Sequence, residues 1–179
     1  VLNRLSEFRA IRRDGSEFPV ELSISPIKTG DVITFCGFIT DITERKKAAE
    51  SLSLLAAIVE SSDDAIIGKD LNGNIVSWNT GAERMFGFTD DEAVGKGIDF
   101  IVPQERMDEE RSLSERIWAG YTEHLITVRL RKDGTPLHVS LTVSPIKDAE
   151  EKIIGASSIS RDISERIRAE EEIRALNSE

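Results

Sequence analysis

Few residues of this chain could carry chemistry. The sequence has two histidines, His124 and His138, and one cysteine, Cys36, and their spacing matches no metal-ligand motif. The acidic run Asp108-Glu109-Glu110 lies within a predicted helix, where we expect a solvated face and not a carboxylate pair for acid–base catalysis. The Gly95-Lys96-Gly97 segment is too short for a phosphate-binding loop. The sequence therefore predicts no catalytic residues, no metal site and no enzymatic activity of its own.

Composition and charge restrict the class of protein further. The 179 residues carry a formal net charge of −10, which repels phosphate backbones, so we expect no binding to nucleic acid. No apolar run approaches the roughly 20 residues that a membrane-spanning helix needs. The single cysteine cannot form an internal disulfide and fits a reducing compartment. These features predict a cytoplasmic protein without a membrane span.

The elements that would position any site are set by an internal repeat. The repeated motifs are Lys132-Asp133-Gly134, Ser144-Pro145-Ile146-Lys147 and Asp162-Ile163-Ser164-Glu165-Arg166, which echo Arg13-Asp14-Gly15, Ser25-Pro26-Ile27-Lys28 and Asp41-Ile42-Thr43-Glu44-Arg45. A repeat of this kind indicates that one structural unit occurs twice.

Each copy predicts a β-hairpin and a third strand. Apolar and polar residues alternate strictly after each Asp-Gly turn, with Phe18, Val20, Leu22 and Ile24 in the first copy and Leu137, Val139, Leu141 and Val143 in the second. Such period-two alternation indicates a strand with one buried face. In the strand before the second turn we expect His124, Ile126, Val128 and Leu130 to face inward. The third strands should cover residues 32–40 and 152–161.

A helix is expected to begin directly after each third strand. Asp41 and Asp162 each precede a glutamate by three positions, an arrangement typical of a capping box. We expect a signal junction at these two helix starts, formed by Asp41, Thr43, Asp162 and Ser164. We also expect Asp162 to pair with a nearby base such as Lys132 or Arg166.

The two helices that follow carry apolar seams of coiled-coil type. The spacing of the apolar residues is four, three and four in the first helix and four and three in the second, which indicates a/d positions. The expected dimer seam consists of Leu52, Leu55, Val59, Ile173 and Leu176, with Ala48 and Ala169 in the same rows. The alternative is that each helix merely packs on its own domain.

Together with these elements, several further motifs resemble the PAS domain family. The motifs are Asp64-Ala65-Ile66-Ile67, the Asn72-Gly73-Asn74 turn, Ile75-Val76-Ser77-Trp78-Asn79, Ala82-Glu83-Arg84-Met85-Phe86-Gly87 and the closing Asp162-Ile163-Ser164. The resemblance implies an α+β fold, with a five-stranded antiparallel sheet, short helices on one face and coiled-coil-type flanking helices. It implies a truncated carboxy-terminal (PAC) half at 1–43, a linker helix at 44–61, a complete domain at 62–165 and an outgoing signalling helix at 166–179. It also implies that the last strand lies at the centre of the sheet beside the first. Because the truncated half lacks that first strand, its residues 32–39 would present an open apolar edge.

The helices of the complete domain have recognisable starts. Thr80 with Glu83 and Thr89 with Glu92 fit the Ser/Thr-x-x-Glu capping box, which predicts short helices at 81–87 and 90–95. A longer helix should follow Pro103.

The resemblance also implies an interior pocket. Its expected lining is Ile67, Trp78, Met85, Phe86, Phe100, Ile101, Leu113, Ile126, Val128, Leu141 and Val143. The sequence leaves open whether this interior is a filled core or a small ligand cavity. Haem-binding members carry an axial histidine on the long helix, and residues 104–119 have none. Photoactive flavin-binding members carry a reactive cysteine where Ile98 stands. We therefore predict no haem and no covalent flavin, while non-covalent flavin or a small ligand remains open.

These observations favour a sensory and dimerisation module of a bacterial-type, multidomain signalling protein. The resemblance suggests an output domain in the same polypeptide, such as a histidine kinase of a two-component system. The alternative is a small-molecule or flavin receptor domain in which the bound ligand, and not the dimer contact, carries the signal.

Overall fold

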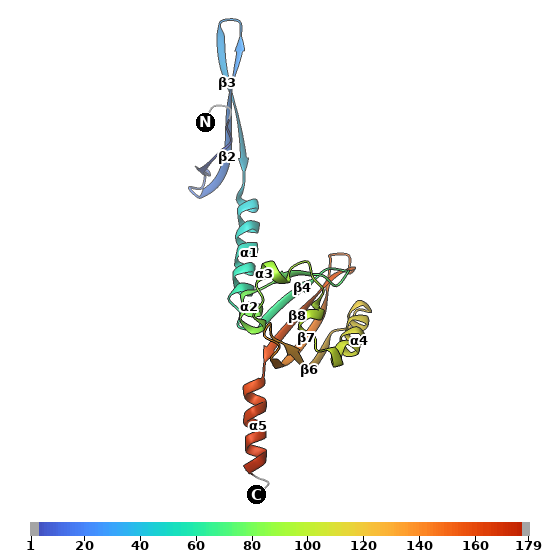
Figure 1. The fold of residues 1–179 in the computed structure, drawn as a ribbon. Coiled ribbons are helices and arrows are strands. Elements are labelled where there is room, and N and C mark those ends of the chain that lie inside the picture. The colour runs from blue at the N-terminus through green and yellow to red at the C-terminus, as the bar shows by residue number, and fades with distance from the viewer. Residues whose placement is uncertain (1–3, 177–179) are drawn as a thin grey trace. The chain divides into compact units, whose positions relative to one another are not determined.

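The computed structural model describes residues 4–176. The chain divides into two compact units, Val1–Ala56 and Ala57–Glu179, which are described separately. Figure 1 shows the elements of each unit. The helices and strands begin and end close to the expected domain limits 1–43, 44–61, 62–165 and 166–179. These domain limits stay a prediction. Residues 177–179, which were expected in the outgoing helix, lie outside the described residues.

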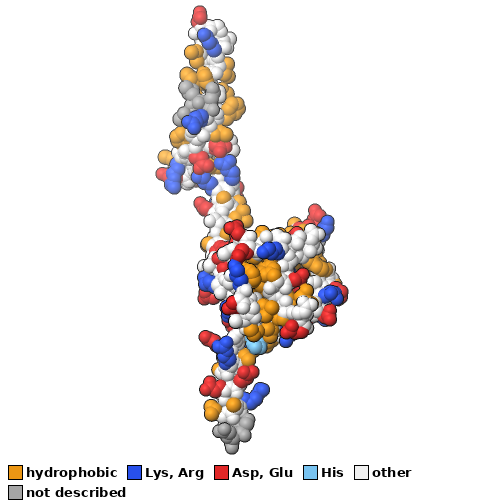
Figure 2. All heavy atoms as spheres, in the orientation of Figure 1, with side chains coloured by type: hydrophobic (Ala, Val, Ile, Leu, Met, Phe, Trp, Pro, Cys, Tyr) orange, Lys and Arg blue, Asp and Glu red, His pale blue; other side chains and the backbone are white. Residues whose placement is uncertain are grey.

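The first unit is a three-stranded antiparallel sheet in the order β1-β2-β3. Its strands are β1 (Ser6–Ile11), β2 (Glu17–Thr29) and β3 (Val32–Asp41), and α1 (Thr43–Glu60) begins after a single intervening residue. Within the described residues β3 pairs only with β2. Exposed apolar side chains line β3, namely Val32, Ile33, Phe35, Phe38 and Ile39, and Figure 2 shows hydrophobic side chains at the surface of this hairpin. The open apolar edge expected from the sequence is therefore present in the first unit.

The second unit is a five-stranded antiparallel sheet in the order β5-β4-β8-β7-β6. Its strands are β4 (Ala65–Lys69), β5 (Ile75–Trp78), β6 (Glu123–Leu130), β7 (Pro136–Lys147) and β8 (Ile153–Asp162). Its helices are α2 (Thr80–Phe86), α3 (Asp90–Ala93), η1 (Ile98–Ile101), η2 (Gln104–Arg106), α4 (Met107–Trp118) and α5 (Ser164–Leu176). The last strand, β8, lies at the centre beside the first strand, β4, as expected.

The core lies between one face of this sheet and the short helices. Ile67 on β4 and Val139 on β7 are almost fully buried, and they belong to one cluster with Phe86 of α2 and Ile117 of α4. The helices between β5 and β6 therefore cover a single face of the sheet, which is the layer arrangement that the sequence predicted.

The expected orientation of β6 is wrong. Ile126 is 67% exposed, whereas Thr127 and Arg129 are 2% and 3% exposed. Thr127 lies opposite Val139 of β7, whose side chain faces the core, so the odd-numbered residues of β6 face inward. The outward face carries His124, Ile126 and Val128. Thr127 and Arg129 face inward because they bind carboxylates of α4. Neither Ile126 nor Val128 therefore lines the interior, and His124 contacts Thr142 at 2.9 Å on the outer face.

The two copies of the repeat form the same turn. Gly15 and Gly134 have φ values of +87° and +82°, a region that glycine enters without steric cost. The preceding carboxylates, Asp14 and Asp133, each accept a hydrogen bond of 2.9 Å from the amide two residues later. The repeat seen in the sequence is therefore a repeat of local hydrogen bonding.

The start of α2 differs from the expected capping box. Asn79, and not Thr80, is the N-cap, and its side chain accepts from the amide of Ala82. The expected box at the next helix is present, because Glu92 accepts from the amide of Thr89 at 3.0 Å. Gly87 closes α2 in the left-handed region.

Candidate functional site

The interior of the second unit is filled by side chains. Nine of the eleven residues expected to line a pocket belong to or pack against the core cluster, namely Ile67, Trp78, Met85, Phe86, Phe100, Ile101, Leu113, Leu141 and Val143. The free volume between Ile67, Ile101 and Leu141 is about 10 Å³, which is room for at most one water molecule. The described interior is thus a packed core.

One part of this core is charged, and the sequence did not predict it. Glu110 on α4 was expected on a solvated face, but its side chain is 8% exposed. Its carboxylate accepts a hydrogen bond of 2.8 Å from Arg129 Nη2. Lys69 Nζ at the end of β4 lies 3.6 Å from the other carboxylate oxygen. Breaking a buried pair by removing one partner typically costs about 3–5 kcal/mol.

A second carboxylate on the same helix completes this cluster. Glu109 lies 3.6 Å from Arg129, accepts a hydrogen bond from Thr127 and pairs with Arg106 at 2.9 Å. Burial lowers the pKa of Arg129, and the charges of Glu110 and Glu109 oppose that shift. We call Lys69, Glu110, Arg129, Glu109 and Thr127 the interior polar cluster; it joins α4 to β4 and β6.

The interior polar cluster borders a surface groove. This groove has a volume of about 370 Å³ and includes Gly97, Met107 and Trp118 in its wall. Lys69 and Glu110 line both the groove and the small interior space. The ion pair between them therefore separates the core from the solvent on this side of the domain.

The exit from the domain is a second candidate site. Asp162 is the last residue of β8, and its Oδ1 accepts from the amide of Ser164 at 2.8 Å. Its Oδ2 accepts from Arg131 at 3.2 Å, and the same guanidinium donates to the carbonyl of Met85 at 2.6 Å. Asp162 thus pairs with a nearby arginine, as expected, but this arginine is Arg131. The two suggested partners are wrong, because Lys132 pairs with Glu92 and Arg166 with Glu170.

The first copy of the repeat has the same junction. Arg12 pairs with Asp41 Oδ2, while Asp41 Oδ1 accepts from the amide of Thr43 at 2.9 Å. Hydrogen bonds from Thr43, followed by that from Arg12, lower the pKa of Asp41 to about 2. In both copies the aspartate binds the amide two residues later, not three as in a capping box, so each junction is an Asx turn tied to an arginine.

The entry to the second unit is fastened by Asn79. This side chain is 1% exposed. Its amide donates to the carbonyls of Val59 and Asp64 at 2.8 and 3.1 Å, and its oxygen accepts from the amides of Ile66 and Ala82, both at 2.9 Å. Asn79 thereby joins the end of α1 to β4 and α2.

An ion pair links the segment that enters the second unit to the strand that leaves it. Arg161, at the end of β8, binds both carboxylate oxygens of Asp64 at 2.9 and 2.7 Å. This bond lowers the pKa of Asp64. Because Arg161 precedes Asp162, the segment that enters the domain contacts the strand that leaves it.

The expected dimer seam is exposed within the chain. Leu52, Leu55 and Val59 are 67%, 59% and 37% exposed. On α5, Ile173 and Leu176 are 60% and 69% exposed. No residue of α1 or α5 is buried in the described part of the chain, so their role in a coiled coil stays a prediction.

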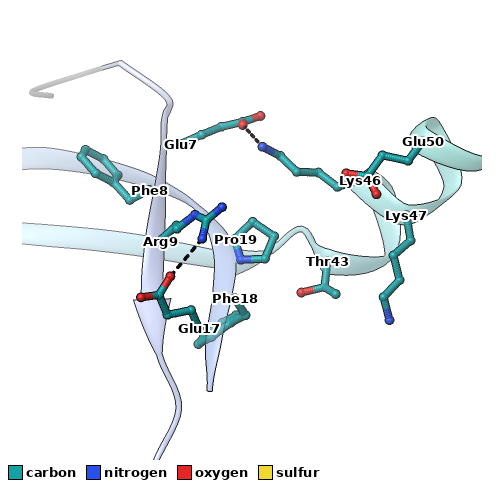
Figure 3. A pocket seen from close by; sticks show the side chains of 10 residues that line it. All are labelled: Glu7, Phe8, Arg9, Glu17, Phe18, Pro19, Thr43, Lys46, Lys47 and Glu50. Carbon is teal, nitrogen blue, oxygen red and sulfur yellow. Dashed lines mark hydrogen bonds and ion pairs between the residues drawn. The ribbon is translucent and has the colours of Figure 1, made fainter. Parts of the chain in front are cut away.

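The first unit also carries a hollow, shown in Figure 3. Its volume is about 570 Å³, and charged residues form much of its lining. These charges pair with one another, Glu7 with Lys46 and Arg9 with Glu17. Because these four charges are paired and open to solvent, this hollow is a weaker candidate than the interior polar cluster.

Residues 4–176 contain neither a candidate metal cluster nor a candidate membrane-spanning helix. No group of three or more His, Cys, Asp and Glu side chains in this range is placed to hold a metal ion. No helix in the same range is long and apolar enough to cross a membrane.

The comparisons with known proteins identify the family. A family model described as the PAS fold matches residues 53–163, and a second, described as a PAS domain, matches residues 3–44. The chain belongs to the PAS family.

Its relatives include sensor proteins. The chain is 27% identical over 152 residues to the sensor protein FixL of Bradyrhizobium diazoefficiens, covering 80% of this chain and 30% of FixL. It is 22% identical over 144 residues to the oxygen sensor protein DosP of Escherichia coli, covering 79% of this chain and 18% of DosP. The chain therefore spans less than a third of either relative.

A solved PAS domain from Colwellia psychrerythraea shares the fold. It superimposes with a TM-score of 0.58 at 24% identity, covering 64% of this chain and 98% of that one. At this identity the likeness establishes the fold alone.

The closed interior does not fit a haem or a flavin ring. The free volume of about 10 Å³ is far smaller than either ring system, and Ile98 lies at its edge. The described residues thus give no basis for a step through either group.

Proposed function

We propose that the second unit is a sensory module that relays a conformational change from its interior, through β8, to α5 and an output domain. The observation that supports this proposal is the position of Arg131, which donates to the carbonyl of Met85 in the core and to the carboxylate of Asp162 at the helix start. A shift of α2 would therefore reach the start of α5 through one guanidinium. A histidine kinase-like output, a cytoplasmic location and the absence of an enzymatic activity in this segment are parts of the same proposal.

The test removes the carboxylate at the exit. Asp162→Ala in the longer parent, or in a fusion to a reporter kinase, should abolish regulation of the output. The domain should stay folded, because loss of a helix cap costs about 0.5–2 kcal/mol. Asp148→Ala is the matched control, since the Asp148 carboxylate also accepts backbone amide hydrogen bonds, from Glu150 and Lys152, but lies in the turn before β8, away from the exit. Unchanged regulation with a lower melting temperature would leave Asp162 as a cap and reject the relay.

We further propose that α1 and α5 form a homodimer through the seam. The five large apolar side chains of the seam are exposed, and burial of each contributes roughly 1.5–3 kcal/mol. Sedimentation at tens of micromolar should give a dimer, and Leu55→Glu should shift it to a monomer. A monomer of the unaltered chain under these conditions would reject the seam.

The second candidate is a receptor in which a bound small molecule carries the signal. The interior polar cluster favours this function, because buried charges with partners on three elements are costly for a domain that only dimerises. Native mass spectrometry of the purified chain distinguishes the two, since it reports both a retained ligand and the number of chains.

A further inference from the structure

The interior polar cluster has an unequal balance of buried charge. Lys69 and Arg129 are 7% and 3% exposed, and Glu110, the carboxylate between them, is 6% exposed. Two buried cations thus share one buried carboxylate, and the nearest further one, Glu109, is about a third exposed. Buried cations of this kind attract an additional anion and do not repel it.

The geometry around Lys69 is also loose. The distance of 3.6 Å between its Nζ and Glu110 Oε1 exceeds the 2.7–3.2 Å of a direct N–H···O hydrogen bond. By contrast, Arg129 reaches the same carboxylate at 2.8 Å. Glu110 therefore binds Arg129 directly and leaves Lys69 without a direct hydrogen bond to this carboxylate.

The surroundings of these cations are those of a small amphipathic ligand site. Ile67, Leu141 and Val143 supply an apolar wall, and the buried hydroxyl groups of Ser158 and Ser160 lie on the same wall. The groove of about 370 Å³ on the other side of the Lys69–Glu110 pair provides a path from solvent. Such a mixture of apolar surface and a few convergent polar groups is typical of small-molecule sites.

We propose that the second unit binds a small carboxylate ligand between Lys69 and Arg129, and that Glu110 occupies the place of the ligand's carboxylate in the closed state. The ligand enters from the groove and displaces Glu110 toward it. Its short aliphatic part then lies against Ile67 and Leu141, and α4 moves because it carries Glu110. This inference rests on the proposed function for its role as a signal, and its binding chemistry is tested separately.

The site is placed to influence the exit of the domain. Ser158 and Ser160 lie on β8, and Asp162 follows Ser160 by two residues on the same strand. A ligand that contacts these hydroxyl groups would act on the strand that ends at the helix junction. This connects the occupant of the interior with the relay through Asp162.

The test uses propionate as the probe and Glu110→Ala to vacate the place of the carboxylate. We expect sodium propionate at about tenfold above its Kd to raise the melting temperature of Glu110→Ala by about 5 °C or more. Sodium chloride at equal ionic strength and propionamide, the uncharged analogue, should have no such effect. Glu110→Ala/Arg129→Met should lose the response, and Glu109→Ala, which leaves Glu110 in place, should respond no more than the unaltered chain.

The unaltered chain provides the second arm. Propionate should shift the methyl NMR signals of Ile67 and Leu141, with an affinity at least about tenfold weaker than for Glu110→Ala because Glu110 competes. If Glu110→Ala is unfolded, propionate should restore its folded tryptophan fluorescence.

Three results would overturn the site: equal effects of propionate and propionamide on Glu110→Ala, an undiminished response of the double variant, or no methyl shift in the unaltered chain. The last would make Glu110 a permanent structural partner. Propionate binding together with a failed Asp162 test would reject the relay and keep the site.

Discussion

Variants of Asn79 should distinguish two contributions to stability, namely the N-cap of α2 and the hydrogen bonds that hold the end of α1. Its oxygen and amide group make four hydrogen bonds, to Ile66, Ala82, Val59 and Asp64. Asn79→Ala removes the cap of α2, which costs about 1 kcal/mol. It also leaves the buried side of the Ile66 amide without its partner, which costs about 1–3 kcal/mol. We therefore expect the free energy of unfolding to fall by about 2–4 kcal/mol.

Urea unfolding followed by tryptophan fluorescence measures this loss in the second unit alone. The two tryptophans of the chain, Trp78 and Trp118, both lie in that unit, and Trp78 is buried. Asn79→Ser should recover about 1 kcal/mol, because serine can still cap α2 but has no amide to donate to Val59. Asn72→Ala, at an exposed turn, should change stability by no more than about 0.5 kcal/mol.

The reasoning also predicts where the chain loosens. In Asn79→Ser, hydrogen exchange should accelerate at the amides of Ser61 and Ser62, which close the end of α1. A loss below about 1 kcal/mol in Asn79→Ala would contradict the contributions assigned to the α2 cap and the Ile66 bond. A Ser variant as stable as the unaltered chain would show that the amide bonds to Val59 and Asp64 contribute nothing.

Two further predictions test the strand orientation and the first junction. Ile126→Ser should change the free energy of unfolding by at most about 0.5 kcal/mol, whereas Leu137→Ala, at a side chain 1% exposed, should lower it by about 2–5 kcal/mol. Urea unfolding measures both changes. A large loss of stability in Ile126→Ser would contradict the assigned face of β6. Because the pKa of Asp41 is lowered from 3.8 to about 2, the stabilisation by its ionised form should be complete above pH 3.8 and disappear as the pH falls toward 2. NMR titration of the carboxyl carbon should show this pKa, and Thr43→Ala, which removes the hydroxyl hydrogen bond, should raise it. An unchanged pKa in that variant would exclude the Thr43 hydroxyl as a cause.

The parts of the fold that sequence predicted are those in which pattern and burial agree. In β7, Leu137, Val139, Leu141 and Val143 alternate with polar residues and all face the core. The same rule fails in β6, because period two identifies two faces but not which of them is inside. Thr127 and Arg129 face inward since α4 provides carboxylates for them.

The interior polar cluster could not be predicted because its members are distant in the sequence. Glu110 stands in an acidic run that normally indicates a solvated helix face. Its burial depends on Arg129 and on Lys69, which come from other elements. A signal was nonetheless present, since Arg129 interrupts the apolar pattern of a strand that pairs with buried β7.

The junction was predicted in position and not in partner. The repeat located Asp41 and Asp162 at the helix starts, and both bind helix-start amides. Arg12 and Arg131 are also equivalent in the repeat, because each lies two residues before the aspartate of its Asp-Gly turn. Comparison of the two copies would have identified this arginine.

The connection between β8 and α5 determines how a change in the length of α5 would act. Only Ile163 separates them, and its amide donates to the carbonyl of His138 while its carbonyl accepts from Ile167. This strand and helix therefore share one continuous hydrogen-bonded backbone, so the angular phase of α5 is set by the sheet. One residue inserted in α5 would rotate all that follows by about 100°, whereas seven inserted residues would return the apolar seam to within about 20° of its original direction. The length of this helix, and not only its composition, is then part of what the domain transmits.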